Sequence, residues 1–214
     1  MAGYIPPVDD ISFLLGEVFD FDAQMATLPG FEEVNTELAT SVMEEGGKFC
    51  AEILEPLNRP GDEEGCKLEN GLVTTPKGVS DAYRAFVEAG WGGLSGDPEF
   101  GGQGLPRALQ ILLDEMLSSA NLSFGLFPGL TRGAVEAIAH HASDELKQTY
   151  LPKMISGEWT GAMALTESSA GTDLGLLTTR AEPVGDGSYS IKGTKIFISS
   201  GCLLYTSPSP RDRG

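Results

Sequence analysis

The change in hydrophobic periodicity at Gly157 constrains the fold of this chain more than any other feature of the sequence. Before Gly157, apolar residues recur every three to four positions in several segments, as in amphipathic helices that pack against one another. After it, short stretches alternate apolar and polar residues, as strands do. The pattern predicts an α+β fold class, with an N-terminal all-α helical domain followed by the truncated start of a β-barrel-like middle domain.

Four segments follow from this pattern. Residues 1–33 form a leader helix and loop, and residues 34–156 form the helical domain. Residues 157–201 begin the middle β domain, which is incomplete because the chain stops before a barrel could close. Residues 202–214 have no periodicity and contain two Ser-Pro pairs, which cannot continue a central strand because proline lacks the donor. We interpret them as a non-native tail, with a native disordered tail as the alternative.

Proline and glycine set the expected boundaries in the first helices. We expect one helix over residues 36–54, ended by Pro56, and then a loop over residues 58–78 that can hold a tight turn at Asn70-Gly71. The residues expected on the apolar face of that helix are Leu38, Val42, Phe49 and Ile53. In the leader helix they are Ile11, Leu14, Leu15 and Val18.

Four later helices are expected before Gly157. Ser80 is the predicted cap of the first, and a strong amphipathic helix follows the Gly/Pro-rich loop over residues 92–104. Another helix is expected after Pro128-Gly129, and Ser143 is the predicted cap of the last one. The apolar stripes of these helices are expected to pack together.

Strands are expected in three places after Gly157. Residues 160–165 are short and apolar, and residues 189–192 alternate behind a glycine-rich turn at 185–187, which predicts a hairpin. Residues 195–199 alternate again. As a strand they would place Ile196 and Ile198 on one face and Lys195, Phe197 and Ser199 on the other.

Composition excludes several classes of function. With 31 acidic and 14 basic residues, the formal charge of −17 disfavours binding to nucleic acid, which needs clustered Lys and Arg. Three cysteines without CxxC spacing and an adjacent His140-His141 pair support neither a disulfide framework nor a metal site. No apolar run is long enough for a membrane span, and residues 1–10 do not read as a secretory signal. We therefore expect a cytoplasmic protein.

Small and hydroxylated residues mark one candidate binding loop. In residues 160–173, Gly171 permits close backbone approach, and the hydroxyls of Thr166 and Thr172 could hold a phosphate or the edge of a heterocycle. The alternative is an ordinary glycine-containing turn whose Ser and Thr side chains bond locally. The spacing alone favours the turn.

Several motifs nevertheless resemble the acyl-CoA dehydrogenase family. Residues 143–153 and 156–159 are similar to its domain junction. Residues 165–173 resemble its Thr-Glu-Pro-Gly-Ala-Gly-Ser-Asp run, and residues 195–201 resemble its later Trp-Ile-Thr run. The resemblance covers nearly the whole chain up to Gly201. The leader and residues 56–66 are similar to the longer bacterial members, a group that includes 3-(methylthio)propanoyl-CoA dehydrogenase.

The resemblance implies an FAD site built from both runs. Thr166 would hydrogen-bond the flavin ring, and Thr172 would lie near the pyrophosphate and contact the CoA arm of the substrate. Phe197 replaces the family tryptophan on the flavin face, and Ser199 replaces the threonine near flavin N5. The residues implied for cofactor binding are Met163, Ala164, Leu165, Thr166, Gly171, Thr172, Phe197, Ile198 and Ser199.

The family oxidises the Cα–Cβ bond of an acyl-CoA with a glutamate base, and the resemblance places that base in a C-terminal helical domain that this chain lacks. Glu158, Glu167 and Asp173 are not candidates for it, and we expect the 214-residue chain to be inactive. The implied partners are an acyl-CoA substrate, an electron-transfer flavoprotein or similar acceptor, and further copies in a homo-oligomer. An acyl-CoA oxidase, which passes electrons to oxygen, and a helical binding module without flavin are the alternatives.

Overall fold

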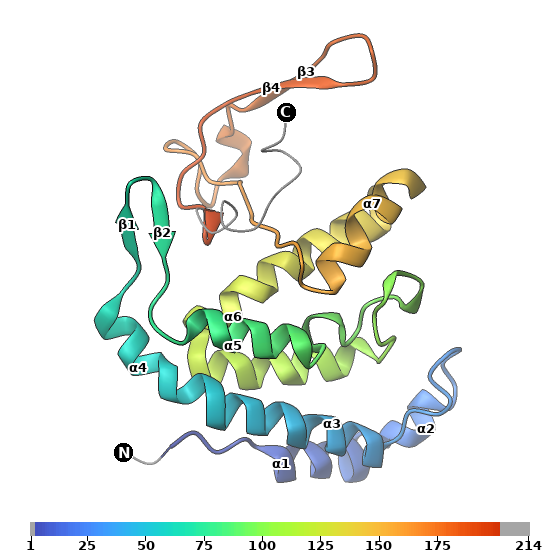
Figure 1. Cartoon of the computed structure of the whole chain (residues 1–214). Helices are drawn as coiled ribbons and strands as arrows, with labels where there is room; N and C mark the ends of the chain where they lie inside the picture. The colour runs from blue at the N-terminus through green and yellow to red at the C-terminus, as the bar shows by residue number, and fades with distance from the viewer. Residues whose placement is uncertain (1–2, 202–214) are drawn as a thin grey trace.

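The computed structural model describes residues 3–201 and has a layer of helices with short hairpins at its edges (Figure 1). This arrangement confirms the predicted α+β class, with a helical part first and a β-containing part after it. None of the helices in residues 3–201 combines the length and the low polarity that crossing a membrane requires. In chain order the helices are α1 (Val8–Phe13), α2 (Phe21–Met25), α3 (Thr36–Phe49), α4 (Glu55–Glu64), α5 (Val79–Glu88), α6 (Arg107–His141) and α7 (Asp144–Ile155); the strands are β1 (Lys67–Glu69), β2 (Leu72–Thr74), β3 (Arg180–Pro183) and β4 (Tyr189–Lys192).

The sequence predicted a helix that is ended by Pro56, and this prediction is wrong. A widened π turn over Cys50–Leu54 joins α3 to α4, so that Pro56 falls in the first turn of α4. Proline is compatible with this position because the π turn directly before it interrupts the regular i→i−4 hydrogen bonding of the helix. The expected loop over residues 58–78 is therefore also wrong, since α4 and the hairpin β1–β2 occupy most of it. The expected turn at Asn70-Gly71 is confirmed, because it connects β1 to β2 and both residues have positive φ.

The buried face of α3 lies one residue away from the expected face. Leu38 and Ile53 are exposed, whereas Ala39 and Met43 are fully buried. The reason is the close approach of neighbouring segments to two glycines: a Cβ on Gly46 would lie 2.9 Å from Leu113 of α6, and one on Gly47 would lie 2.7 Å from Pro6 of the leader. Small residues thus set which side of α3 faces the core. Phe49 is buried as predicted.

Helix α6 combines two of the expected helices. Its backbone leaves helical geometry at Asn121 (φ −157°, ψ 91°), and Pro128 lies within the second half. The amide of Asn121 donates to the carbonyl of Leu54 at 3.1 Å, and its oxygen accepts from the backbone N–H of Phe124, which caps the second half. The side chain of Asn121 therefore satisfies one backbone N–H at the bend and also joins it to the segment before α4.

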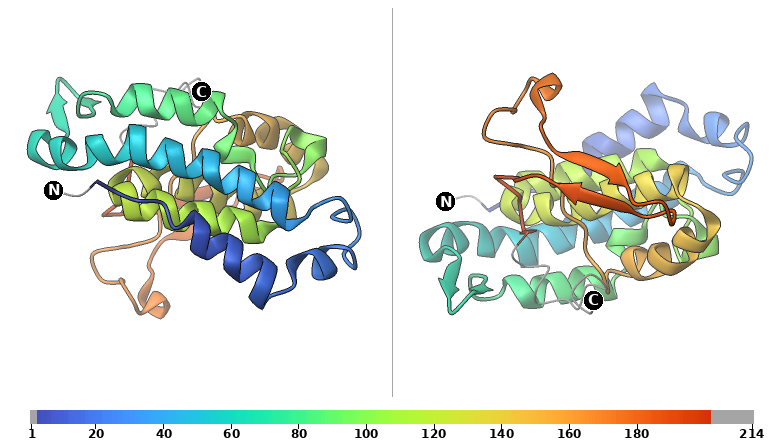
Figure 2. Two further views of the ribbon diagram at one scale, coloured as in Figure 1. Left: turned by 90° about the horizontal axis from the view of Figure 1, so that it is seen from below. Right: turned by 90° about the horizontal axis from the view of Figure 1, so that it is seen from above.

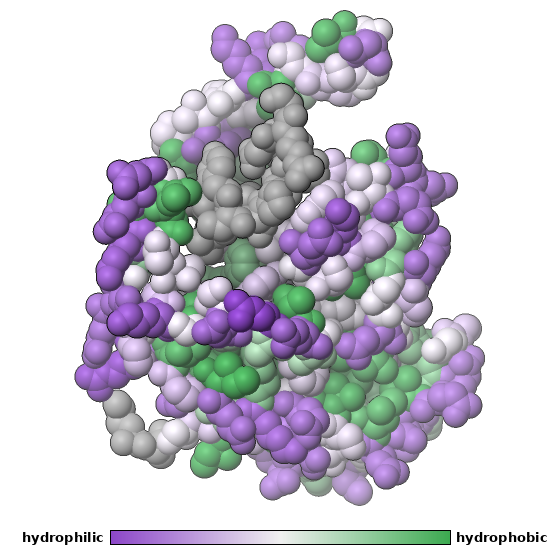
Figure 3. Space-filling model, in the orientation of Figure 1, coloured by the Kyte–Doolittle hydropathy of each residue, from purple (hydrophilic) through white to green (hydrophobic). Residues whose placement is uncertain are grey.

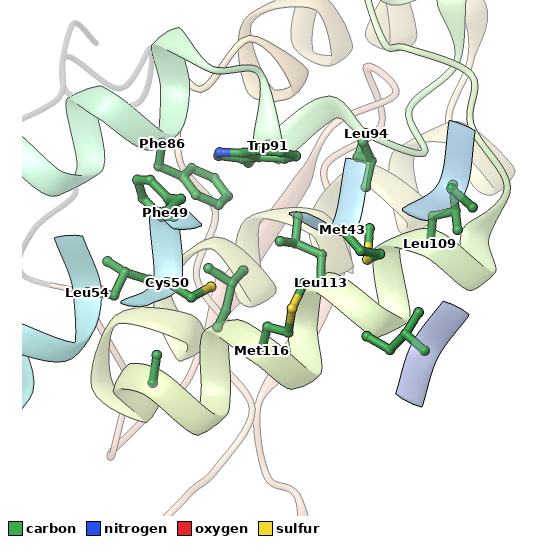
Figure 4. Packing of buried hydrophobic residues seen from close by; sticks show 14 of the residues in the cluster. Met43, Phe49, Cys50, Leu54, Phe86, Trp91, Leu94, Leu109, Leu113 and Met116 are labelled. Atoms are coloured by element: carbon green, nitrogen blue, oxygen red, sulfur yellow. The ribbon is translucent and has the colours of Figure 1, made fainter. Parts of the chain in front are cut away.

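The main core lies between α3, α5 and α6 (Figure 4). Met43 and Cys50 point toward Leu113 and Met116, while Phe86 and Trp91 cover them from the side of α5. Burial raises the pKa of the Cys50 thiol to about 12, because a thiolate would be poorly solvated there. The sulfur therefore behaves as a packing atom.

Two predicted caps have different outcomes. Ser143 accepts a hydrogen bond from the backbone N–H of Leu146 at 3.4 Å, which confirms it as the cap of α7. Ser80 is not a cap, because α5 already begins at Val79, after Gly78 at φ 84°. The side chain of Leu57 lies 2.7 Å from where a Cβ of Gly78 would be, so this entry to the helix is closely packed.

The hairpin expected at residues 189–192 behind the 185–187 turn is confirmed, because β3 and β4 pair antiparallel from Arg180 opposite Lys192 to Pro183 opposite Tyr189. This hairpin lies on one side of the helical layer, as Figure 2 shows from above. Residues 160–165 and 195–199, however, are not strands. Strand geometry needs a ladder partner, and within residues 3–201 neither segment has one.

Truncation of the core should destabilise the helical layer. We expect Leu113→Ala to lower the free energy of unfolding by about 2–5 kcal/mol, because Leu113 is fully buried against α3 and its loss leaves a cavity. Ile111→Ala in the same helix is the matched control, since Ile111 is 60% exposed, and its effect should stay below about 1 kcal/mol. Urea titrations followed by far-UV circular dichroism give both values. Equal losses would contradict this core assignment.

Candidate functional site

The two segments that the sequence analysis singled out lie against each other. The backbone N–H of Ile196 donates to the carbonyl of Thr166 at 2.9 Å. One residue earlier, the ammonium of Lys195 donates to the carbonyl of Leu165, also at 2.9 Å. The first segment enters from the end of α7 and the second leaves β4, so the fold brings together residues about 30 positions apart in the chain.

Glu167 connects a third segment to these two. Its side chain is only 3% exposed, and one carboxylate oxygen accepts from Lys195 at 2.9 Å and from the N–H of Thr179 at 3.0 Å. The other oxygen accepts from the N–H of Thr178 at 2.8 Å and from its hydroxyl at 2.6 Å. The Lys195 ammonium, followed by the Thr178 and Thr179 donors, holds the pKa of Glu167 well below its usual range. The carboxylate therefore stays ionised at neutral pH.

The loop after Glu167 is a tight turn. Glu167 and Ala170 exchange backbone hydrogen bonds of 3.0 and 3.1 Å, and Ala170 is buried. The turn leaves Gly171 and Thr172 exposed. Asp173 then accepts from the N–H of Gly175 at 2.9 Å and caps the short helical turn Leu174–Leu176. The loop therefore contains the local Asp hydrogen bond of an ordinary turn, while Gly171 and Thr172 face solvent.

The remaining predicted site residues are mostly solvent-facing. Met163 is 57% and Phe197 86% exposed, whereas Thr166 and Leu165 are half-buried between the segments. The predicted alternation over residues 195–199 is wrong, because Phe197 has φ 55°, a left-handed conformation that breaks the period of two. Ala164, Ile198 and Ser199 are exposed beside it. Gly171 and Thr172 take part in none of the described hydrogen bonds that join the segments.

Sequence reasoning missed the partners of Glu167. Lys195 lies 28 positions away, and the two threonines lie 11 and 12 positions away. No helical or strand period connects such separations. The one available signal was that Glu167 lies just after an apolar run. An acidic residue at such a position becomes buried unless the chain turns toward solvent there.

A separate cavity of about 130 Å³ lies between α5, the glycine-rich loop, α6 and α7. The Tyr83 hydroxyl donates to the carbonyl of Gly157 at 3.2 Å on its wall, and burial raises the pKa of Tyr83 to about 12. Other polar groups of the wall are also engaged: Gln103 donates to the Gly90 carbonyl at 2.9 Å, and Arg132 pairs with Asp114 at 2.6 Å. In residues 3–201 no cluster of His, Cys, Asp and Glu could hold a metal ion.

Comparison with known protein families matches residues 36–158 to the acyl-CoA dehydrogenase N-terminal domain. The chain belongs to the acyl-CoA dehydrogenase family. It is 44% identical to 3-methylmercaptopropionyl-CoA dehydrogenase of Ruegeria pomeroyi over 92% of this chain and 34% of that protein. It is also 36% identical to a butyryl-CoA dehydrogenase of Syntrophomonas wolfei, over 92% of this chain and 33% of that protein. The resemblance to the family and to its longer bacterial members is thus confirmed.

The fold comparison agrees with the sequence comparison. The acyl-CoA dehydrogenase of Bacillus anthracis, a structure complexed with FAD, superposes with a TM-score of 0.64 at 24% identity and covers 78% of this chain and 27% of that chain. At that identity the likeness shows the fold alone. The chain spans about a third of the length of the curated relatives it matches.

Close packing behind the site should make Gly193 intolerant of a side chain. A Cβ at Gly193 would lie 1.9 Å from the hydroxyl oxygen and 2.7 Å from the Cβ of Thr179, so we expect Gly193→Ala to displace residues 178–179 from Glu167. Hydrogen exchange at the Thr178 and Thr179 amides should accelerate at least tenfold. Gly171→Ala is the control, because nothing lies within 4 Å of its Cβ position and its φ is not positive. Unchanged exchange in Gly193→Ala would contradict the contact.

Proposed function

We propose that the runs at residues 163–173 and 195–199 form one wall of an FAD site, in a longer protein that dehydrogenates an acyl-CoA thioester between Cα and Cβ. The observation that carries this proposal is the hydrogen bond between Ile196 and Thr166, which holds the two family motifs side by side. A planar ring can contact both motifs only if they share a surface.

The residues in this wall fit a flavin. The exposed side chains of Met163 and Phe197 offer an apolar and aromatic surface to a planar ring, and hydroxyls lie in both runs. The residues that would hold the cofactor are Met163, Ala164, Leu165, Thr166, Gly171, Thr172, Phe197, Ile198 and Ser199, with Thr172 also contacting the CoA arm of the substrate. Bound FAD supplies the redox chemistry by accepting a hydride.

The protein groups of this chain have binding and orienting roles. With FAD bound, the Thr166 hydroxyl would donate to the ring, Phe197 would cover the ring and exclude water, and the Ser199 hydroxyl would lie near the ring. Glu167 cannot act as the base that removes the α-proton, because its carboxylate is buried and already accepts four hydrogen bonds. Glu158 pairs instead with Lys153 at 3.4 Å on the surface. The base belongs to a C-terminal helical domain outside this chain.

We propose that residues 1–33 form a leader, residues 34–156 the helical domain and residues 157–201 the start of the middle domain. The family domain matches residues 36–158, which supports the proposed boundary between the helical domain and the middle domain. The two relatives described above are butyryl-CoA and 3-methylmercaptopropionyl-CoA dehydrogenases, which supports a short acyl group in the thioester. We further propose an electron-transfer flavoprotein or similar acceptor, and a homo-oligomeric cytoplasmic enzyme. The proposed tail, residues 202–214, lies outside the described residues.

A chimera tests the function. Residues 1–201 would replace the corresponding part of the Ruegeria pomeroyi relative, so that the remaining two thirds of the enzyme are supplied. We expect the purified chimera to bind FAD and its flavin to be reduced anaerobically by an acyl-CoA, whereas the 214-residue chain alone should give no turnover. A folded chimera without bound FAD would overturn the proposal. Rapid reoxidation of its reduced flavin by oxygen would favour an acyl-CoA oxidase instead.

Substitutions in the second run separate a flavin site from a helical binding module. Phe197→Ala and Ser199→Ala in the chimera should each weaken FAD binding by about tenfold, since each removes a ring contact or a hydrogen bond. Ile191→Ala is the control, because Ile191 is an equally exposed apolar residue on β4 outside the proposed wall. Flavin fluorescence titration measures all three. An unchanged affinity in both Phe197→Ala and Ser199→Ala would remove the second run from the site.

A further inference from the structure

We propose that Glu167 and Lys195 form a positioning pair that fixes Thr166 and Phe197 in the geometry in which they contact the flavin. This inference rests on the proposed function and assigns a role to two residues that the site description leaves without one. Neither side chain faces solvent enough to touch a cofactor directly, because Lys195 is 18% and Glu167 3% exposed. Their effect must therefore pass through the backbone that they hold.

The pair holds the peptide around Thr166 on both sides. Lys195 donates to the carbonyl of Leu165, the residue before Thr166, and to the carboxylate of Glu167, the residue after it. The carbonyl of Thr166 itself accepts from the N–H of Ile196, the neighbour of Lys195. Three consecutive residues of the first run are thus fixed against two consecutive residues of the second. The backbone of Thr166 can reorient only if one of these bonds breaks.

The carboxylate also fixes the segment behind the wall. The carboxylate accepts four hydrogen bonds, from Lys195, Thr178 and Thr179. These bonds use the lone pairs of both carboxylate oxygens. Charge-assisted bonds of this kind are stronger than neutral ones, and a buried carboxylate left without its cation is destabilised. The threonine segment in turn packs against Gly193, two residues before Lys195. Lys195 bonds to Leu165 and Glu167, Glu167 bonds to Thr179, and Thr179 packs against Gly193. The contacts thus form a closed circuit that returns to Lys195.

This circuit of contacts reaches Phe197 through one intervening residue. Only Ile196 separates Lys195 from Phe197, whose φ of 55° is unfavourable for a side chain with a Cβ. Such a conformation persists where its surroundings hold it. The Lys195 bonds and the Ile196 N–H bond directly before Phe197 are the contacts that hold it here. Loss of the ammonium would therefore release the aromatic ring as well as Thr166.

The first arm of the test uses the 214-residue chain as it exists. Lys195→Met and Glu167→Gln should each speed hydrogen exchange at the amides of Thr178, Thr179 and Ile196 by about 10- to 100-fold, the equivalent of one charge-assisted hydrogen bond. Glu158→Gln is the matched control, since it removes a Glu–Lys pair of the same type whose side chains are 45% and 61% exposed. Far-UV circular dichroism checks that the helices persist. Unchanged exchange in both variants would overturn the pair.

The second arm uses the FAD-loaded chimera and separates positioning from stability. Both substitutions should weaken FAD binding by about 10- to 100-fold and alter the visible circular dichroism of the bound flavin, whereas Glu158→Gln should change neither. Lys195→Arg, which keeps the charge, should restore most of the affinity. Bound flavin with unchanged affinity and spectrum in Lys195→Met would refute the positioning role while the proposed function stands. An unsubstituted chimera that binds no FAD would instead refute the proposed function, leaving the first arm to judge the pair.

Discussion

A carboxylate without solvent must be surrounded by donors, and this constraint organises everything after α7. The Glu167 side chain lies where the chain leaves the helical layer, and its four donors come from two later segments. A sheet ladder could have ordered this part of the chain, but within residues 3–201 only β3 and β4 pair there. Polar contacts to one buried charge therefore take the place of a ladder. The relative position of the two family motifs depends on them.

The helical layer is held by a different kind of interaction. Its core joins α3, α5 and α6 through apolar contacts, and the face seen in Figure 3 carries hydrophilic residues (purple) with hydrophobic ones (green) between them. Apolar burial is non-directional, so loss of one methyl group there alters stability more than geometry. Hydrogen bonds to Glu167 are directional, so their loss alters geometry first. The stability of the helical layer and the relative position of the two motifs thus depend on different residues of one chain.

Sequence alone predicted the features whose cause is local. The Asn70-Gly71 turn, the Ser143 cap and the β3–β4 hairpin depend on residues within a few positions of one another, and the α+β order follows from the change of period at Gly157. The family motifs were recognisable for the same reason, because each is a short continuous run. Features with distant causes were not predictable. The face of α3 depends on how closely α6 approaches Gly46, which no period records.

The two mistaken strands show the same limit at the site. Alternation of apolar and polar residues over residues 195–199 is compatible with a strand, but a strand forms only against a partner. Within residues 3–201 the single ladder-like bond of this segment is Ile196 to Thr166. Without further pairing the segment is not held in strand geometry, and Phe197 has a positive φ. The expectation that both motifs meet nevertheless survives, since their contact comes from the buried Glu167–Lys195 pair rather than from strand geometry. The Glu167–Lys195 ion pair, not periodicity, joins the two motifs.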